Sequence, residues 1–139
     1  MAESIYPCLW FDGKAKEAAE YYCSIFKNSK ILSENHMVVQ FELNGKKIMG
    51  LNGGPLYKFN EAISLVLECD NQEEIDYYWN SLTQDGGKEV QCGWLKDKYG
   101  VSWQVIPKML SELLGNPNKA ESVIKAFMQM KKIIIADLL

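Results

Sequence analysis

The side chains best suited to nucleophilic chemistry are one histidine, His36, and four cysteines. A nucleophilic cysteine or serine needs a neighbouring base to take its proton, most often a histidine. His36 follows Asn35 in a predicted turn, where we expect a surface position. The cysteines have no paired or metal-type spacing, so we predict reduced structural residues at Cys8, Cys23, Cys69 and Cys92. The sequence therefore disfavours cysteine–histidine and serine–histidine mechanisms.

Among the carboxylates, Glu68 is the candidate for a general base, because it falls on the face of a predicted strand that points away from the core. Simple solvation of Glu68 is the alternative. Asp97 precedes a turn at 98–100, and we expect it to stabilise that turn through a local backbone hydrogen bond. The charged groups at 14–20 and 72–76 are interpreted as the solvated faces of two helices.

Composition sets the broad class of the protein. The chain has 139 residues, 47% of them hydrophobic, which is enough for one packed domain or for two small modules that share a core. Its formal net charge of -3 provides no basic field for nucleic acid or anionic lipid. No long apolar run and no basic N-terminal region occur, so we expect a soluble cytoplasmic protein with no membrane partner.

The elements that must position these residues follow one order twice. The first module, 1–52, reads as a strand (5–11), a helix (14–26) and strands at 30–33, 38–43 and 46–51, the last two joined by Asn44-Gly45. A linker follows at 53–61. The second module, 62–106, reads as a strand (63–69), a helix (72–82), one or two strands within 88–95 and a closing strand (101–106). Both modules are therefore predicted as β-α-β-β-β.

The two halves also align residue by residue. Glu20-Tyr21-Tyr22 corresponds to Asp76-Tyr77-Tyr78, and the stretch from Asn44 to Met49 corresponds to that from Tyr99 to Gln104. A period this long with two copies indicates paired modules rather than a solenoid. The tail, 107–139, differs: helices are predicted at 107–114 and 117–132, and Ile133-Ile134-Ile135 could continue the second one. Its apolar stripe is expected to pack against the sheet or a partner subunit.

In this order of elements the chain resembles the vicinal-oxygen-chelate (glyoxalase/bleomycin-resistance/dioxygenase) superfamily. Within it, the chain is most similar to the PhnB-like, 3-demethylubiquinone-9 3-methyltransferase-type family. The resemblance covers about residues 5–106 and is carried by Phe11-Asp12-Gly13, Tyr21-Tyr22, Phe41-Glu42-Leu43-Asn44-Gly45, Leu51-Asn52-Gly53-Gly54-Pro55, Phe59-Asn60 and the run from Gly93 to Gln104. It implies an α+β fold of two curled mixed sheets, each with a helix on its convex face. It also implies a pocket enclosed by the concave faces, within or across a homodimer.

Metal-dependent members of the superfamily carry His, Gln or Glu on the first and last strands of each module. Carried over by position, those sites are Tyr6, Met49, Ser64 and Gln104 here, and a shift of one residue would substitute Pro7 for Tyr6. This set contains no imidazole and no carboxylate, the ligands that divalent ions prefer. We therefore expect no metal and no other cofactor. The sequence also lacks a glycine-rich strand-to-helix turn that could cradle a nucleotide-type cofactor.

Strand alternation predicts which side chains face the pocket. Tyr6, Cys8 and Trp10 share one side of the first strand, and Ser102 and Gln104 share one side of the last strand, where Trp103 is assigned to the core. Trp94 is interpreted as a pocket wall or a subunit contact, and Asn52 and Asn60 as turn or ligand residues. The predicted ligand pocket comprises Tyr6, Trp10, Met49, Asn52, Asn60, Ser64, Glu68, Trp94, Ser102 and Gln104.

Two functions compete for this pocket. The first is metal-free binding of a small, partly aromatic molecule, because the predicted lining is aromatic and apolar with sparse polar groups. The second is an enzyme of unknown reaction. The lack of a paired carboxylate or an activated nucleophile favours binding. A third interpretation is a module whose function is dimerisation.

Overall fold

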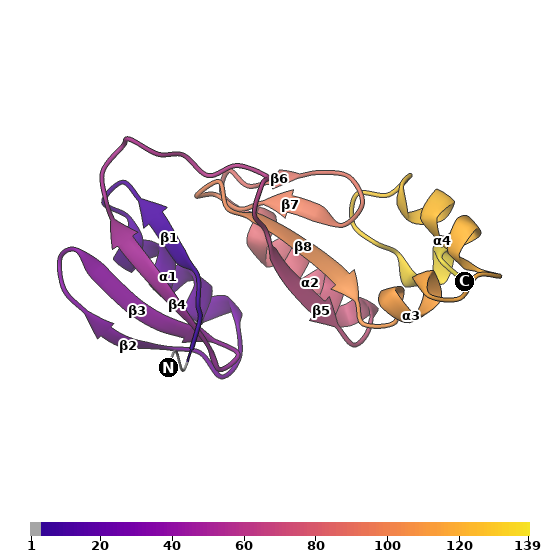
Figure 1. Ribbon diagram of the computed structural model, residues 1–139, viewed down its shortest axis with the longest axis horizontal. Helices are drawn as coiled ribbons and strands as arrows, with labels where there is room; N and C mark the ends of the chain where they lie inside the picture. Colours follow the sequence, from indigo (N-terminus) through magenta and orange to yellow (C-terminus); the bar gives the residue numbers. More distant parts are fainter. Residues whose placement is uncertain (1–3) are drawn as a thin grey trace. The chain divides into compact units, whose positions relative to one another are not determined.

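The computed structural model describes residues 4–139 of the chain. They fall into two compact units, one ending at Lys58 and the other beginning at Phe59 (Figure 1). We call them unit 1 and unit 2, and each is described by itself.

Unit 1 contains β1 (Cys8–Phe11), α1 (Ala15–Ile25), β2 (Lys30–Glu34), β3 (Val38–Leu43) and β4 (Lys46–Asn52). Within the described residues the strands form a mixed sheet in the order β1-β4-β3-β2, with β1 parallel to β4 and the other pairs antiparallel. Asn44 and Gly45 join β3 to β4 with φ values of 52° and 78°, as a tight hairpin turn requires. The predicted β-α-β-β-β order and the hairpin are confirmed.

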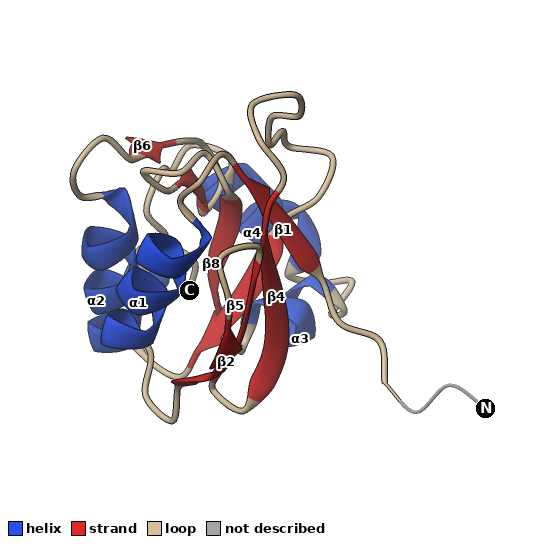
Figure 2. Ribbon diagram, turned by 90° about the vertical axis from the view of Figure 1, so that its left-hand side faces the viewer, coloured by secondary structure: helices blue, strands red, loops and turns tan. Residues whose placement is uncertain are grey.

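The core of unit 1 lies between its sheet and α1 (Figure 2). Alternate strand residues point to this side, and the helix presents small residues and one large aromatic ring. Tyr22 is fully buried and its ring stacks on Phe41 with the centroids 6.2 Å apart. Gly50 lets the sheet approach the helix closely, since a Cβ there would lie 3.3 Å from the Cβ of Ala15. Other core residues are Leu9, Phe11, Ala18, Ala19, Val39, Leu43 and Ile48.

Unit 2 repeats this arrangement with β5 (Leu65–Cys69), α2 (Gln72–Thr83), β6 (Lys88–Glu89), β7 (Trp94–Lys96) and β8 (Ser102–Pro107). In the described part of the chain the strand order is β5-β8-β7-β6, again with a parallel first pair. The stripe of Ile75, Trp79 and Leu82 on α2 is buried against Leu95, Trp103 and Val105 of the sheet. The internal repeat inferred from the sequence is therefore present in the fold, including the core position of Trp103.

The C-terminal tail consists of α3 (Leu110–Leu114), α4 (Ala120–Phe127) and a 3-10 turn, η1 (Ile135–Asp137). The prediction of a helix to Lys132, continued by the isoleucines, is wrong, because α4 ends at Phe127. Beyond it the backbone makes contacts outside the helix: Cys92 N donates to Met130 O and Gly93 N donates to Lys131 O. Only part of the predicted apolar stripe is buried: Val123 packs with Leu110, Ile133 and Leu138, while Ile124 and Met128 are exposed.

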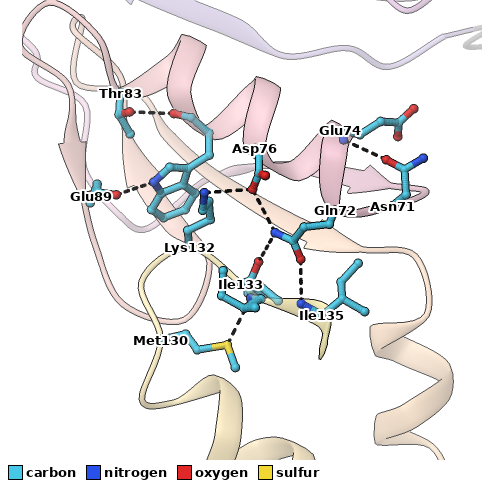
Figure 3. A network of polar contacts seen from close by, with 12 residues as sticks. Asn71, Gln72, Glu74, Asp76, Thr83, Glu89, Met130, Lys132, Ile133 and Ile135 are labelled. Atoms are coloured by element: carbon cyan, nitrogen blue, oxygen red, sulfur yellow. Dashed lines mark hydrogen bonds and ion pairs between the residues drawn. The ribbon is translucent and has the colours of Figure 1, made fainter. Parts of the chain in front are cut away.

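Polar side chains of α2 attach the end of the tail to unit 2 (Figure 3). Gln72 donates through Nε2 to Ile133 O at 3.0 Å and accepts through Oε1 from Ile135 N at 2.8 Å. Asp76 pairs with Lys132 at 2.9 Å, and the hydrogen bond from Gln72 together with this ion pair lowers the pKa of the Asp76 carboxyl. Asn71 caps the start of the helix by accepting from Glu74 N. The tail is therefore an integral part of unit 2.

None of the helices formed by residues 4–139 has the length and apolar character needed to cross a lipid bilayer.

Candidate functional site

In each unit one side of the sheet packs under a helix, and we call the other side its open face. On unit 1 the partners in register place Cys8, Met49 and Gln40 in one row and Trp10, Leu51 and Val38 in the next. These side chains are exposed or half-buried, whereas their neighbours Leu9 and Phe11 are buried against α1. The alternation therefore puts Trp10 and Met49 on the open face of unit 1, and Tyr6, just before β1, lies against Lys47 of β4.

One end of this face is charged. Lys47 lies over the ring of Tyr6, with Nζ 4.4 Å from the centroid, in cation–π geometry. Its register partner Glu42 pairs with Lys30 at 3.9 Å. The cation beside Tyr6 makes this phenol unsuited to holding a metal ion, because two positive charges would repel each other.

The other end of the face is aromatic, and the segment 53–57 covers it. Trp10 Nε1 donates to Gly54 O at 2.8 Å, and the Trp10 ring meets Tyr57 edge-on with the centroids 4.8 Å apart. Gly53 is required for this approach, since a Cβ at that position would come within 2.3 Å of the indole. Tyr57 is 62% exposed, so this aromatic pair presents one ring to solvent.

The side-chain amide of Asn52 makes hydrogen bonds to two other parts of unit 1. Oδ1 accepts from Ala15 N at 2.9 Å, which satisfies one backbone donor in the first turn of α1. Nδ2 donates to His36 O at 3.0 Å. The residue therefore links the end of β4 to the start of α1 and to the 35–37 turn. A ligand would have to compete with these bonds for the Asn52 amide.

The open face of unit 2 is more polar. Gln104 lies between Val66 of β5 and Trp94 of β7 in register, and its Nε2 donates to Ser64 Oγ at 3.0 Å. Ser102 lies opposite Lys96 in the next row. Glu68 is exposed at the far end of β5, in register with Ile106. The structure thus brings Ser64, Trp94, Ser102 and Gln104 together, with Glu68 at the margin.

Two residues of this face have unusual surroundings. Ser102 is 1% exposed, and its Oγ has no hydrogen-bond partner within residues 4–139. Lys96 forms an ion pair with Glu61, and the hydrogen bond between them lowers the pKa of the Glu61 carboxyl.

Asn60 lies in the segment that precedes β5, where its Oδ1 accepts a hydrogen bond from Ala62 N at 2.8 Å in a local turn.

Asp97 fixes the turn between β7 and β8, and the predicted backbone bond is confirmed. Its Oδ1 accepts from Tyr99 N and Val101 N at 2.9 and 3.1 Å. Its Oδ2 accepts from Trp103 Nε1 at 2.9 Å, although Asp97 is only 2% exposed. The carboxylate thereby sets the position of the strand that carries Ser102 and Gln104.

Three of the four cysteines have a thiol pKa above the ordinary value, which argues against a thiolate nucleophile at those positions. Burial raises the pKa of the Cys8 and Cys23 thiols, with Glu42 adding to the effect at Cys23. Burial raises the pKa of Cys69 to about 12, with smaller contributions from Glu74 and Asp70. Reactive cysteines are those whose pKa is lowered.

The described residues offer no divalent-metal centre. Across residues 4–139, no three His, Cys, Asp or Glu side chains are grouped so that they could hold a metal ion. Of the four positions carried over from metal-dependent relatives, Tyr6 lies under Lys47, and Gln104 is bonded to Ser64. With Met49 as the fourth member, the set contains neither a carboxylate nor an imidazole. These residues do not fit a divalent ion.

The sequence prediction missed three residues that shape these faces: Lys47, Tyr57 and Lys96. Alternation from Met49 and Trp94 would have pointed to the two lysines, since each lies two residues from a predicted pocket residue. Nothing in the local sequence indicates that Tyr57 meets Trp10, because that contact depends on the path of the 53–57 segment.

One protein family matches this chain. The sequence model of the 3-demethylubiquinone-9 3-methyltransferase family matches residues 3–106. A solved structure described as a putative 3-demethylubiquinone-9 3-methyltransferase, PhnB protein, from Bacillus cereus is 32% identical, with a TM-score of 0.69. The match covers 76% of this chain and 99% of that one. Among curated proteins, none is significantly similar to this chain.

More distant structures share the fold alone. The fosfomycin resistance protein FosX from Listeria monocytogenes, solved with Mn(II) and sulfate, is 16% identical with a TM-score of 0.61, over 82% of this chain and 96% of that one. A glyoxalase-related enzyme from Fulvimarina pelagi is 12% identical with a TM-score of 0.59, over 79% and 91%.

Proposed function

The chain belongs to the 3-demethylubiquinone-9 3-methyltransferase family, a PhnB-like branch of the vicinal-oxygen-chelate superfamily, and we propose that it binds a small, partly aromatic molecule without a metal ion. The ligand lies on an open face, where side chains of mixed chemistry are left accessible. The observation that carries this proposal is the pattern on unit 2: Trp94 and Val66 flank Gln104, and Ser64 is bonded to it. An apolar surface with a few convergent polar groups is the usual composition of a small-molecule site.

The metal-free part of the proposal is supported by the donor set. Tyr6, Met49, Ser64 and Gln104 supply no anionic ligand, and Lys47 adds a positive charge beside Tyr6. FosX, which has the same fold, was solved with Mn(II), so the fold itself accommodates a metal in other proteins. We therefore attribute the expected lack of a metal ion in this chain to the side chains at these four positions rather than to the fold.

An enzyme of unknown reaction on the same faces is the alternative, and the family description favours it. Glu68, an exposed carboxylate at the margin of the open face of unit 2, would be the general base. Catalysis would need a substrate whose reacting proton comes within hydrogen-bonding distance of that carboxylate. Transfer of a methyl group from S-adenosylmethionine to a quinol by the purified protein would establish this alternative.

A thermal-shift experiment tests the binding proposal. The purified chain is heated with indole, phenol or naphthol, and separately with Mn²⁺, Zn²⁺ or Ni²⁺. We expect an aromatic molecule at 100 times its Kd to stabilise the protein by about 2.7 kcal/mol, and the metals to have no such effect. Stabilisation by a divalent metal would contradict the metal-free proposal.

Two variants localise the binding. Trp94→Ala removes an aromatic side chain from the open face of unit 2, and we expect it to abolish the shift caused by the aromatic ligand. The matched control is Tyr77→Ala, which removes an aromatic side chain from α2, where Tyr77 is 50% exposed. Equal losses in the two variants would place the ligand elsewhere.

The chain is further proposed to form a homodimer in the cytoplasm. Ile63, which precedes β5, and Val66, within β5, are 67% and 57% exposed, and exposed apolar side chains of this kind favour an interface. The cysteines among the described residues are free, which is typical of a reducing compartment. Light scattering on the purified protein is expected to give twice the chain mass of 15.9 kDa, and the mass of one chain would contradict the dimer.

A further inference from the structure

Ser102 is enclosed on a side of the sheet that is otherwise open. In the neighbouring row, Val66 is exposed and Trp94 and Gln104 are half-buried, whereas Ser102 is 1% exposed. No helix packs on this side of the sheet, so a different segment must cover this one row.

The register of the strands identifies the cover. Ser64 directly precedes β5, and the pairing of β5 with β8 places it beside Ser102. On the other side of Ser102 lies its register partner on β7, Lys96. Glu61, three residues before Ser64, forms an ion pair with Lys96. The chain before β5 therefore reaches across β8 to β7, and this ion pair spans the row that contains Ser102.

Residues 59–64, which we call the strap, are also attached at both ends. At the start, Phe59 Cβ lies 4.0 Å from the point that a Cβ on Gly100 would occupy, in the turn between β7 and β8. At the end, Ser64 Oγ accepts from Gln104 Nε2 at 3.0 Å. The ion pair is the attachment of the middle of the strap.

The closed position of the strap is held weakly. Ser102 Oγ has no hydrogen-bond partner within residues 4–139, so its enclosure costs free energy that contact with water would restore. The side chain of Glu61 is 60% exposed and that of Lys96 is 33% exposed. An ion pair this accessible contributes little to stability and is screened by salt. Opposed by the enclosed hydroxyl and held by an exposed ion pair, the strap is poised to open.

We propose that the strap is a lid over one row of the open face of unit 2, with the Glu61–Lys96 ion pair as its latch. Opening the latch brings Ser102 into contact with water and frees the ammonium of Lys96 next to Trp94 on β7. More of the open face then becomes available to a ligand. The effect on ligand access rests on the proposed binding function, but the opening of the strap does not.

Alkylation of a Ser102→Cys protein by iodoacetamide measures the opening without any ligand. The tryptic peptide 99–108 contains no native cysteine, so mass spectrometry of this peptide reports position 102 alone. Because alkylation requires the open form, its rate follows the population of that form. We expect the additional substitution Glu61→Gln to raise the rate about two- to fivefold, the effect of losing one exposed ion pair. About 1 M NaCl should raise the rate when Glu61 is present and have little effect on Glu61→Gln.

Lys96→Gln breaks the latch from its other side. It should raise the alkylation rate as much as Glu61→Gln, and the two substitutions together should add nothing further. The matched control is Glu121→Gln, which breaks an exposed ion pair with Lys125 on α4 and should leave the rate unchanged. Unchanged rates in both latch variants would overturn the proposal, and so would an equal increase in the control.

Titration calorimetry with 2-naphthol tests the effect on ligand access, in proteins that keep Ser102. We expect Glu61→Gln to bind 2-naphthol about two- to fivefold more tightly than the wild-type protein, in proportion to the open form. Equal affinities together with faster alkylation would overturn the control of access by the strap. Absence of binding to both proteins would instead contradict the proposed function, and the alkylation rates would still decide whether the strap opens.

Discussion

Replacing Asp97 by alanine is expected to lower the free energy of unfolding by about 3–5 kcal/mol. The carboxylate accepts from two backbone N–H groups of its own turn and from the indole of Trp103. Asp97 is 2% exposed and Trp103 is 4% exposed, so water cannot replace the lost acceptor without opening the turn. Urea unfolding followed by tryptophan fluorescence measures the change.

Asp97→Asn and Asp12→Ala are the matched controls. Asparagine keeps one side-chain oxygen and can still accept from the turn, so we expect about half of the loss. Asp12 is exposed in the turn after β1, and its removal should change stability by about 0.5 kcal/mol or less. A loss below about 1 kcal/mol in Asp97→Ala would contradict the role assigned to this carboxylate.

The Asp97→Ala substitution is also expected to affect ligand binding on the open face of unit 2. Trp103 lies between Ser102 and Gln104 on β8, and Asp97 holds its indole. In an Asp97→Ala protein that remains folded, weaker binding of an aromatic ligand is expected because the two polar side chains lose their fixed positions.

Replacing Ile133 by alanine is expected to destabilise the protein by about 3 kcal/mol. Ile133 is fully buried and packs with Leu110, Val123 and Leu138. It also lies against Gly93, where an added Cβ would come within 2.9 Å of Ile133 Cδ1, so the contact is close. The cavity would weaken the attachment of the tail that Gln72 provides through Ile133 O and Ile135 N.

Ile124→Ala is the matched control, since the same atoms are removed from α4 at a position that is 39% exposed. Its effect should be about 1 kcal/mol or less. Hydrogen exchange at Gly93 N and Ile135 N reports the attachment directly, because both groups donate across this junction. Equal losses in the two variants would mean that the tail does not depend on the buried isoleucine.

Local patterns in the sequence predicted much of the fold. Alternation in Val38–Leu43 and the Asn44-Gly45 turn predicted a hairpin that the structure contains. The repeat of Glu20-Tyr21-Tyr22 at Asp76-Tyr77-Tyr78 indicated two equivalent helices, and both cover equivalent sheets. These features depend on the period of a helix or strand, which a sequence carries within a few residues.

Other features required the tertiary structure, because they join residues far apart in the chain. Asn52 bonds to Ala15, and Gln72 bonds to residues 61 and 63 positions later. The end of α4 at Phe127 follows from contacts of Met130 and Lys131 with the loop before β7, which outweigh the helical pattern of the tail. No local preference encodes such bonds.

The side chains that could do chemistry divide in the same way, into those that the sequence characterised and those that required the tertiary structure. By itself, the sequence determined that one histidine and four unpaired cysteines form no recognisable nucleophile or metal motif, since residue types and spacings are sufficient for that conclusion. It also determined, through alternation, which strand positions share a face. Only the tertiary structure decided which of those side chains remain available: Asn52 is used by α1, Trp10 is covered by Gly53 and Gly54, and Ser102 is left buried without a bond in the described chain. The reason is physical: periodicity assigns a side chain to a face, but packing decides what surrounds it there.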